Sequence, residues 1–423
     1  MSVEGRGLSP LGHSGMPATA KLSQPFEMQT PRDTNLRWNN RVVRRTFKYR
    51  AYPTPTQDQA LHGQVDEACR LYNGALDERR SAWRMNGVSL GYYDQASQLK
   101  EIRAAGDVGV ANFSACQDVL RRVNKTFAAF FRRVKAGEKQ PGYPRFRSRF
   151  RYDSLTYPSW GDGCALRTTG RLYLQGVGDL KLKWHRPLPA DAQIKTVTAK
   201  RGAGRWFVCF SVEMPNPEAL PVCDLEVGID VGLTTFAVLS DGREIANPRH
   251  YRLAERRLRI AQRKLARRKK RSRRRVKARQ ELARVQEHIG NQRRDFHHKS
   301  ALALVRDYGL IAVEELNVKG LAASMLAKSV HDAGWSQFVS ILSSKAECAG
   351  RTLVKVNPAG TTQRCSGCGE DVPKTLAERV HECPACGLVL GRDLNAARNI
   401  LRLGQGLGWS LQAGTVEVAH AVA

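Results

Sequence analysis

Two pairs of cysteines place the strongest constraint on how this chain can fold. Cys365 and Cys368 form one Cys-x-x-Cys pair and Cys383 and Cys386 form another, with 14 residues between the pairs. Thiolates spaced in this way can reach one tetrahedral metal ion, at about 2.3 Å for zinc. Four thiolates close the coordination sphere, so we predict one structural zinc site, with a rubredoxin-like iron site as the alternative. Such a site supplies on the order of 10 kcal/mol of folding free energy to an insert with little core.

The other six cysteines are single residues and are expected to be small core residues. They are Cys69, Cys116, Cys164, Cys209, Cys223 and Cys348. Scattered single cysteines beside one metal site are typical of a reducing compartment. No apolar run approaches the roughly 20 residues of a membrane span, and no signal peptide opens the chain. We therefore expect a cytoplasmic protein without a membrane partner.

The charge balance indicates the kind of partner. The chain has 69 Lys and Arg against 39 Asp and Glu, a formal net charge of +30. Repulsion on that scale opposes a compact fold unless a polyanion screens it. Nucleic acid is the expected polyanion, since its phosphates bind Lys and Arg with release of counterions. An acidic membrane surface is the competing interpretation.

The N-terminal half combines helices with a small β domain. Residues 1–40 are rich in Gly, Pro and Ser and are interpreted as a disordered leader. Two amphipathic helices are expected, one beginning at a capping box of Thr56 and Gln59 and the other at Ser114 with Gln117. An apolar period near two predicts strands at Val42–Tyr52, Leu172–Leu174, Leu180–Trp184, Ile194–Ala199 and Trp206–Val212.

The second half opens with three strands and a basic segment. The run from Leu225 to Ile245 predicts strand, turn, strand, an Asp-Gly hairpin and a third strand. Residues 252–279 hold 16 Lys or Arg and one acid, which favours a nucleic-acid-contacting helical arm over an ordinary solvated helix face. A buried strand at Leu310–Val313 and a helix at Trp335–Ala349 follow.

Basic residues of the arm, of the outer face of the second helix and near the chain end are predicted to contact nucleic acid. They are Arg267, Arg268, Lys269, Lys270, Arg271, Arg273, Arg274, Arg275, Arg121, Arg122, Lys125, Arg132, Arg133 and Arg392. For Arg392, a simple salt bridge is an equal alternative.

Three carboxylates are candidate ligands of a second metal centre. Asp230 lies within an apolar strand, Glu314 ends another, and Asp393 opens a short helix after the cysteine module. An unpaired charge in an apolar strand is costly, which implies a cation or a strong partner for Asp230. Singly, Glu314 could be a strand-end charge and Asp393 a helix N-cap. Together, on a three-strand meander, a later strand and a C-terminal helix, they match an RNase-H-type nuclease site with two Mg²⁺ ions about 4 Å apart.

The motifs around these residues resemble the TnpB (OrfB-type) transposon-encoded proteins. The matching segments are 228–232 (GIDVG), 311–320 (IAVEELNVKG), the two CxxCG knuckles and 392–400 (RDLNAARNI). Segments 47–53, 70–73 and 142–146 are similar to N-terminal landmarks of that family, so the resemblance covers about residues 41–405. The family's motif favours Glu314 over Glu315 as the acid. Gly391 stands where the family often has Asp, so an auxiliary acid is expected to be missing.

The resemblance implies an RNA-guided DNA endonuclease that needs a guide RNA, a double-stranded DNA target, two Mg²⁺ and one structural Zn²⁺. Its fold class is α/β and α+β multidomain: a RuvC-like nuclease domain with a zinc-ribbon insert, preceded by a wedge β domain that carries a helical recognition insert. The implied ranges are 1–40 leader, 41–55 and 140–222 wedge domain, 56–139 recognition domain, 223–360 and 390–405 RuvC-like domain, 361–389 zinc insert, and 406–423 tail.

Four other functions stay open at this stage. Compact type V CRISPR effectors look like descendants of the same family and share its layout. A guided DNA-binding repressor would bind without cutting, and a transposase in the strict sense would join DNA ends. A zinc-ribbon nucleic-acid-binding protein without enzymatic activity would leave Asp230 unexplained. A monomer is expected in each case.

Overall fold

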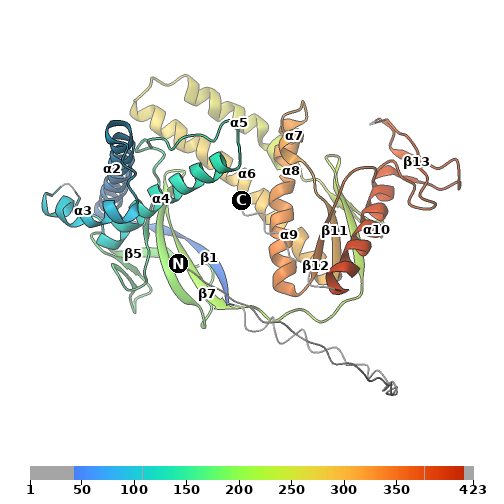
Figure 1. The fold of residues 1–423 in the computed structure, drawn as a ribbon, viewed down its shortest axis with the longest axis horizontal. Helices are drawn as coiled ribbons and strands as arrows, with labels where there is room; N and C mark the ends of the chain where they lie inside the picture. The colour runs from blue at the N-terminus through green and yellow to red at the C-terminus, as the bar shows by residue number, and fades with distance from the viewer. Residues whose placement is uncertain (1–41, 107, 376, 414–423) are drawn as a thin grey trace, which may run out of the picture.

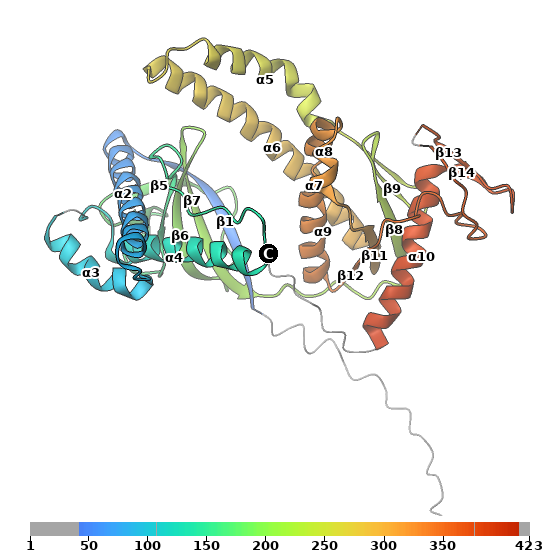
Figure 2. The same cartoon turned by 45° about the horizontal axis from the view of Figure 1, so that its top comes forward.

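The chain forms two units that lie side by side. The computed structural model describes residues 42–106, 108–375 and 377–413, so the predicted leader lies outside the described residues. The first unit is built on a seven-stranded sheet and the second on a five-stranded sheet. A pair of long helices reaches from the second unit back toward the first (Figures 1 and 2).

The first strand of the chain is the central strand of the seven-stranded sheet of the first unit. Strand β1 (Val42–Tyr52) lies antiparallel between β7 and β5, in the order β2-β6-β7-β1-β5-β4-β3. The ladder between β1 and β7 runs from the pair Val42 and Pro215 to the pair Ala51 and Trp206. The other strands are β2 (Ser154–Tyr157), β3 (Cys164–Leu166), β4 (Leu172–Leu174), β5 (Gly178–Lys183), β6 (Gln193–Gly202) and β7 (Arg205–Pro215). The helices between β1 and β2 are therefore an insertion into one β domain, as predicted.

Three helices form that insertion: α2 (Pro55–Asn86), α3 (Tyr92–Ala104) and α4 (Phe113–Lys135). The predicted start of α2 is wrong by two residues. The capping box is Thr54 with Gln57, and Pro55 takes the first helical position, where its missing N–H costs nothing. The start of α4 shifts as well, because Asn112 rather than Ser114 accepts the bond from the Ala115 amide. In both helices the observed N-cap is a polar residue two positions before the predicted one.

The five-stranded sheet has the topology of an RNase-H-type domain. Its order is β10-β9-β8-β11-β12, with β8, β9 and β10 antiparallel and β8, β11 and β12 parallel. The strands are β8 (Glu226–Val231), β9 (Thr235–Leu239), β10 (Glu244–Ala246), β11 (Leu310–Glu314) and β12 (Thr352–Val356). The predicted meander and the later strand are confirmed.

Helices cover both faces of this sheet. On one face, α6 (Arg273–Asp307) and α9 (Trp335–Ala349) pack their apolar residues against Ile229 and Val313. On the other face, Ile400 of α10 (Arg392–Ala413) packs against Leu310 and Ala312. Since successive strand residues point to opposite faces, Asp230 and Glu314 belong to the α10 face.

Close approach of α10 to the sheet depends on a glycine. A Cβ atom built on Gly228 would lie 2.1 Å from the Ala397 carbonyl oxygen and 2.5 Å from the Leu401 nitrogen, both backbone atoms of α10. Gly404 repeats the arrangement from the helix side, because its Cβ would lie 2.4 Å from the Cβ of Ala312. Only glycine at these positions lets helix and strand backbones come so near.

The basic segment forms a helical hairpin rather than one continuous helix. Helix α5 (His250–Ala266) ends before residues 267–272, and α6 begins after Ser272, whose hydroxyl caps it. The most basic run, Arg267–Arg271, forms the turn at the tip. Two short helices, α7 (Val318–Leu321) and α8 (Ala327–Ala333), lie between β11 and α9. No helix within the described ranges is long and apolar enough to span a membrane.

Two further features differ from the sequence prediction. Helix α3 and the strands β2 and β3 have no counterpart in it, since β2 and β3 are only four and three residues long. Helix α10 continues to Ala413, so the tail expected from residue 406 begins as helix. Residues 414–423 of that tail lie outside the described part of the chain.

Replacing Gly228 by alanine tests the helix-to-strand contact. We expect Gly228→Ala to lower the free energy of unfolding by about 1–3 kcal/mol, because α10 must move away from β8. Gly290→Ala in α6 is the matched control: its Cβ meets nothing within 4 Å. There the change should be neutral or stabilising by up to about 1 kcal/mol. Equal denaturation midpoints for both variants would contradict the close contact.

Candidate functional site

The three predicted carboxylates lie on one face of the five-stranded sheet. Ile229 of β8 is paired with Val313 of β11, and Asp230 and Glu314 are the next residues of these parallel strands. Asp393 lies in the first turn of α10, which packs on the same face. Asp393 is thus a helical residue and not the N-cap considered as its alternative role. The structure brings together residues that are far apart in the sequence.

Burial and neighbouring charges shift the pKa of Asp230, and burial shifts that of Glu314. Burial, followed by the charges of Glu314 and Asp393, raises the pKa of Asp230 to about 7, while Arg392 opposes the increase. Burial also raises the pKa of Glu314. All three residues are half-buried, so a ligand can reach them. Carboxylates gathered in this way favour a proton or a cation between them.

Two neighbours fix the orientation of these acids. The hydroxyl of Thr361 donates to Glu314 Oε1 at 2.5 Å, which lowers the Glu314 pKa against the effect of burial. Arg392 Nε lies 3.3 Å from Asp393 Oδ1 and its Nη1 donates to the Glu378 carbonyl. The salt bridge considered for Arg392 is therefore present. Thr361 is buried and was missed by sequence reasoning, because a single threonine outside any motif carries no signal.

The geometry fits magnesium. Oxygen ligands from three carboxylates are those that Mg²⁺ takes in nucleases. Two ions about 4 Å apart spread their ligands more widely than one ion does. Among the described residues, only the cysteine quartet gathers its ligand atoms within 4.8 Å of one another. The three carboxylates do not form so compact a set, and the roles of Asp230, Glu314 and Asp393 as ligands stay a prediction.

A cavity of about 450 Å³ lies next to Glu314 on the α9 side of the sheet. Glu314 and Glu315 both line it, together with Trp335 and serines of α9 such as Ser340. Glu315 is exposed, whereas Glu314 is half-buried and held by Thr361. This difference supports Glu314 as the member of the acidic cluster.

The four cysteines of the knuckles form a compact cluster. Cys365 Sγ lies 3.7 Å from Cys386 Sγ, and Cys368 Sγ lies 3.5 Å from Cys383 Sγ. These distances are too long for disulfides, and all four sulfurs lie within 4.8 Å of one another. A tetrahedral zinc with bonds of about 2.3 Å separates its sulfurs by about 3.8 Å. The cluster fits one zinc ion, and iron has the same donor set.

Local structure prepares the cluster for a metal. Gly369 and Gly387 follow the two pairs at φ 85° and 72°, where the chain turns without a Cβ clash. The Gly367 amide donates to Cys365 Sγ at 3.3 Å. Burial raises the pKa of Cys365, but hydrogen bonds from backbone amides and neighbouring side chains lower it to about 5. At Cys365 the thiolate, the form that binds metal, is thereby favoured.

The insert that carries the four cysteines is tied to α10. Its short ribbon consists of β13 (Val380–Glu382) and β14 (Val389–Gly391), and α10 follows at once. Asn395 of α10 accepts from the Ser366 amide at 2.8 Å and donates to the Arg364 carbonyl at 2.7 Å. Asn399 donates to the carbonyls of Thr361 and Arg364. The i, i+4 spacing of the two asparagines is the one signal that could have predicted this contact.

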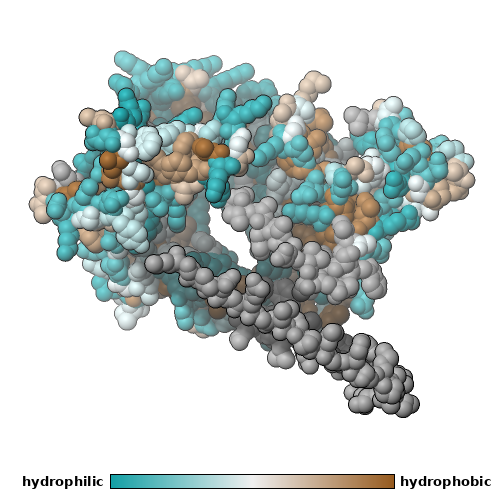
Figure 3. All heavy atoms as spheres, in the orientation of Figure 1, coloured by the Kyte–Doolittle hydropathy of each residue, from teal (hydrophilic) through white to brown (hydrophobic). Residues whose placement is uncertain are grey.

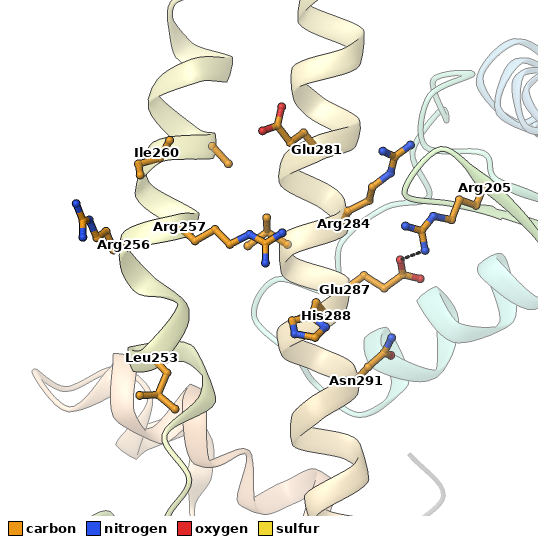
Figure 4. Close-up of a pocket in the computed structure, with 12 residues that line it drawn as sticks. Arg205, Leu253, Arg256, Arg257, Ile260, Glu281, Arg284, Glu287, His288 and Asn291 are labelled. Carbon is orange, nitrogen blue, oxygen red and sulfur yellow. Dashed lines mark ion pairs between the residues drawn. The ribbon is translucent and has the colours of Figure 1, made fainter.

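Basic side chains gather where the helical hairpin meets the first unit. A cavity of about 790 Å³ lies between α5, α6 and the start of β7. Figure 4 shows Arg257 extending from α5 toward α6, with Arg284 and Arg205 on the far side of α6. Arg205 pairs with Glu287 at 3.9 Å, and Arg284 Nε donates to the Ala203 carbonyl. The hairpin therefore links the two units and presents positive charge between them.

Some of the residues predicted to contact nucleic acid also bond within the protein. Arg122 is bound to Asp118, to the Ser154 carbonyl and to Thr156, and so joins α4 to β2. Arg275 donates to the carbonyls of Leu265 and Arg268 and closes the tip of the hairpin. Arg133 donates to the Gly142 carbonyl. The remaining basic candidates of the hairpin and of α4 are exposed: Arg267, Arg268, Lys269, Lys270, Arg271, Arg273, Arg274, Arg121, Lys125 and Arg132.

Three family models match the chain. One described as "Probable transposase" matches residues 209–325, a "Cas12f1-like, TNB domain" matches residues 335–400, and a "Helix-turn-helix domain" matches residues 42–87. In this structure the last range forms strand β1 and the single helix α2, rather than two short helices.

Known proteins are similar over most of the chain. A "Putative RNA-guided DNA endonuclease" of Streptomyces pristinaespiralis is 36% identical over 370 residues, 86% of this chain and 90% of that protein. "Putative RNA-guided DNA endonuclease InsQ" of Escherichia coli K12 is 27% identical over 393 residues, 87% and 95% respectively. The protein in the Cas12f1-sgRNA-target DNA complex superposes with a TM-score of 0.56 at 14% identity, covering 85% of this chain and 98% of that one. That likeness establishes the fold.

Replacing Asp230 by asparagine should stabilise the magnesium-free protein in a pH-dependent way. The folded pKa of about 7 exceeds the unfolded value near 3.9, so stability from the protonated acid is lost as the pH rises toward and through 7. Asp230→Asn cannot ionise. Its advantage in unfolding free energy should be small at pH 5 and about 2 kcal/mol at pH 8.

Thermal melts at both pH values, without added divalent ions, measure this difference. Asp224→Asn, at an exposed acid outside the cluster, is the control and should show no such trend. Added magnesium should stabilise the wild type and not Asp230→Asn. A pH-independent difference between wild type and Asp230→Asn would contradict the cluster.

Removal of one thiolate should release the structural metal. Cys383→Ser leaves three thiolates, and we expect it to lose bound zinc and to expose residues 361–392 to hydrogen exchange. Cys209→Ser changes a half-buried cysteine of β7 and should keep one metal per chain. Elemental analysis by mass spectrometry measures the content and separates zinc from iron. One retained metal in Cys383→Ser would show that the quartet is not the site.

Proposed function

This chain belongs to the TnpB (OrfB-type) family, and on that premise we propose that it is an RNA-guided DNA endonuclease that cleaves DNA beside a short duplex motif. One observation carries the proposal: Asp230, Glu314 and Asp393 converge on one face of an RNase-H-type sheet. The names of the Streptomyces and Escherichia relatives describe the same activity and support it.

The three carboxylates would hold two Mg²⁺ ions. When bound, such ions polarise the scissile phosphate and make water a nucleophile at neutral pH. Asp230 must lose its proton to become a ligand, and its pKa of about 7 allows this near physiological pH. Thr361 engages one oxygen of Glu314 and leaves the other to bind metal. Arg392 pairs with Asp393 and keeps it at the edge of the site.

Guide RNA and target DNA would bind the basic surfaces that join the two units. Pairing between guide and one DNA strand supplies the sequence specificity, while the protein reads the adjacent duplex motif. Phosphates would contact the exposed tip of the hairpin, residues 267–271, and the exposed basic side chains of α4. The displaced strand would then reach the acids on the α10 face of the sheet. We infer that this takes place in the cytosol of a prokaryotic cell, on a monomer.

The same geometry would serve a compact type V CRISPR effector. Its reaction is identical, and the match to a "Cas12f1-like, TNB domain" is the observation that keeps it as the second candidate. The source of the guide RNA separates the two: a transcript of the flanking element for the first, and a CRISPR array for the second. A guided repressor would bind the target without cutting, and a transposase would join ends.

Guided cleavage tests the proposal. The chain is expressed with its flanking DNA, copurifying RNA is sequenced, and a plasmid that carries the matching target is supplied with magnesium. We expect a discrete RNA and hydrolysed ends. Asp230→Ala and Glu314→Gln should reduce cleavage to the background of the assay, while Glu315→Gln, its matched neighbour, should retain activity.

Other outcomes would indicate one of the alternative functions or contradict the proposal. Target binding without cleavage by the wild type would indicate a repressor, and strand-joined products would indicate a transposase. Cleavage by Asp230→Ala at the wild-type rate would remove the carboxylates from the mechanism. Absence of any discrete RNA in the purified protein would contradict the guided reaction.

A further inference from the structure

The segment of residues 142–152, here called the strap, connects α4 to β2 without helix or strand. Its sequence, GYPRFRSRFRY, alternates aromatic and basic residues. The side chain of Asn73 in α2 holds it at Arg147 by two hydrogen bonds of 2.8 Å, donating to the carbonyl and accepting from the amide. Cys69 Sγ donates to the same carbonyl at 3.3 Å. An amide side chain that pairs with both backbone groups of Arg147 imitates one step of a β-ladder.

Further contacts fix the strap on both sides of Arg147. Arg149 pairs with Asp66 of α2 at 2.8 Å, and Arg201 of β6 donates to the Arg149 carbonyl at 3.0 Å. Pro144 and Tyr152 are buried. The backbone is therefore held at several points, and the outward side chains of the strap keep fixed positions.

Those outward side chains include aromatic rings that the core does not use. Tyr143, Phe146 and Phe150 are 44%, 50% and 64% exposed. Phe131 of α4 is 58% exposed, and Figure 3 shows apolar residues among hydrophilic ones over α4. Arg279 of the hairpin lies over the Phe150 ring, 4.8 Å from its centre. Exposed phenylalanines on a fixed backbone imply a binding role, because burial would otherwise be favoured.

We propose that the strap stacks unpaired bases of the guide RNA on Phe146 and Phe150. The inference rests on the proposed function and adds a binding surface to it. Aromatic faces separated by arginines suit unpaired nucleotides: rings stack on bases, and Arg145 and its neighbours meet the phosphates. Guide RNA is the occupant because protein recognition of RNA targets unpaired, splayed bases, whereas bases of the target strand are paired with the guide. The displaced DNA strand is unpaired too, but it must reach the acids of the second unit, and the strap lies in the first.

Binding of RNA by the full chain, with Asp230→Asn to prevent cleavage, tests the proposal. The probe is a mixed-sequence single-stranded RNA oligonucleotide, compared with the same RNA annealed into a duplex and with the same sequence as single-stranded DNA. Phe146→Ala with Phe150→Ala should weaken single-stranded RNA binding about 5- to 100-fold. Phe146→Trp with Phe150→Trp should restore it. Tyr93→Ala, at an 85% exposed ring of α3, should change nothing.

Salt dependence separates stacking from charge. Loss of the rings removes no phosphate contact, so the slope of log affinity against log salt should stay at its wild-type value. Arg145→Gln should instead reduce that slope. Unchanged melting temperatures for the alanine variants are expected, because both rings are half exposed or more.

Each other result overturns the inference. Equal weakening of duplex RNA binding would mean that the rings do not contact bases. Weakening confined to single-stranded DNA would assign the strap to a DNA strand. Unchanged single-stranded RNA binding would remove the strap from recognition. Guided cleavage is scored separately in the chain with Asp230 intact, so failure of the proposed function and failure of this inference give different results.

Discussion

The contact between α10 and β8 is the constraint on which the candidate site depends. Gly228 offers no side chain, so the backbone of α10 rests directly on the strand. That distance places Asp393 where its charge raises the pKa of Asp230. Three acids would separate if the elements that carry them could move. A buried strand pair and a helix in backbone contact cannot relax in that way, so the repulsion is left for cations to neutralise.

The zinc insert and the acidic site are parts of one mechanical unit. Folding of the insert around its metal orders the chain from residue 361 onward, and Asn395 and Asn399 hold that segment against α10. Thr361, at the start of the segment, donates to Glu314. A structural metal in the insert would thus support the orientation of Glu314, although the cysteine cluster and the acidic cluster share no residue. Loss of zinc would therefore alter the orientation of Glu314 as well as the structure of the insert.

Local patterns predicted much of the fold and the chemistry. Neighbouring residues alone indicate the cysteine spacing, the apolar period of β8 and the length of α9. Contacts across the chain were not predictable in this way: Arg122 bonds β2, and Thr361 meets a glutamate 47 positions away. Helix starts failed where two capping residues lay close together, since Pro55 decided between Thr54 and Thr56. That choice is local, whereas the contacts of Arg122 and Thr361 depend on tertiary structure that no short window contains.

Two N-terminal landmarks gain a physical meaning from one contact. The segments 70–73 and 142–146 have no catalytic chemistry, yet Asn73 binds the backbone of Arg147 from 74 positions away, and the Arg147 guanidinium lies 5.7 Å from the centre of the Tyr72 ring. Amide side chains satisfy backbone groups in an irregular segment, where neither helix nor strand can do so. The same device recurs at Asn395 and Asn399. In both units, asparagines on a helix hold an irregular segment in place: the strap in the first unit, and in the second the start of the insert, from which Thr361 reaches the acids.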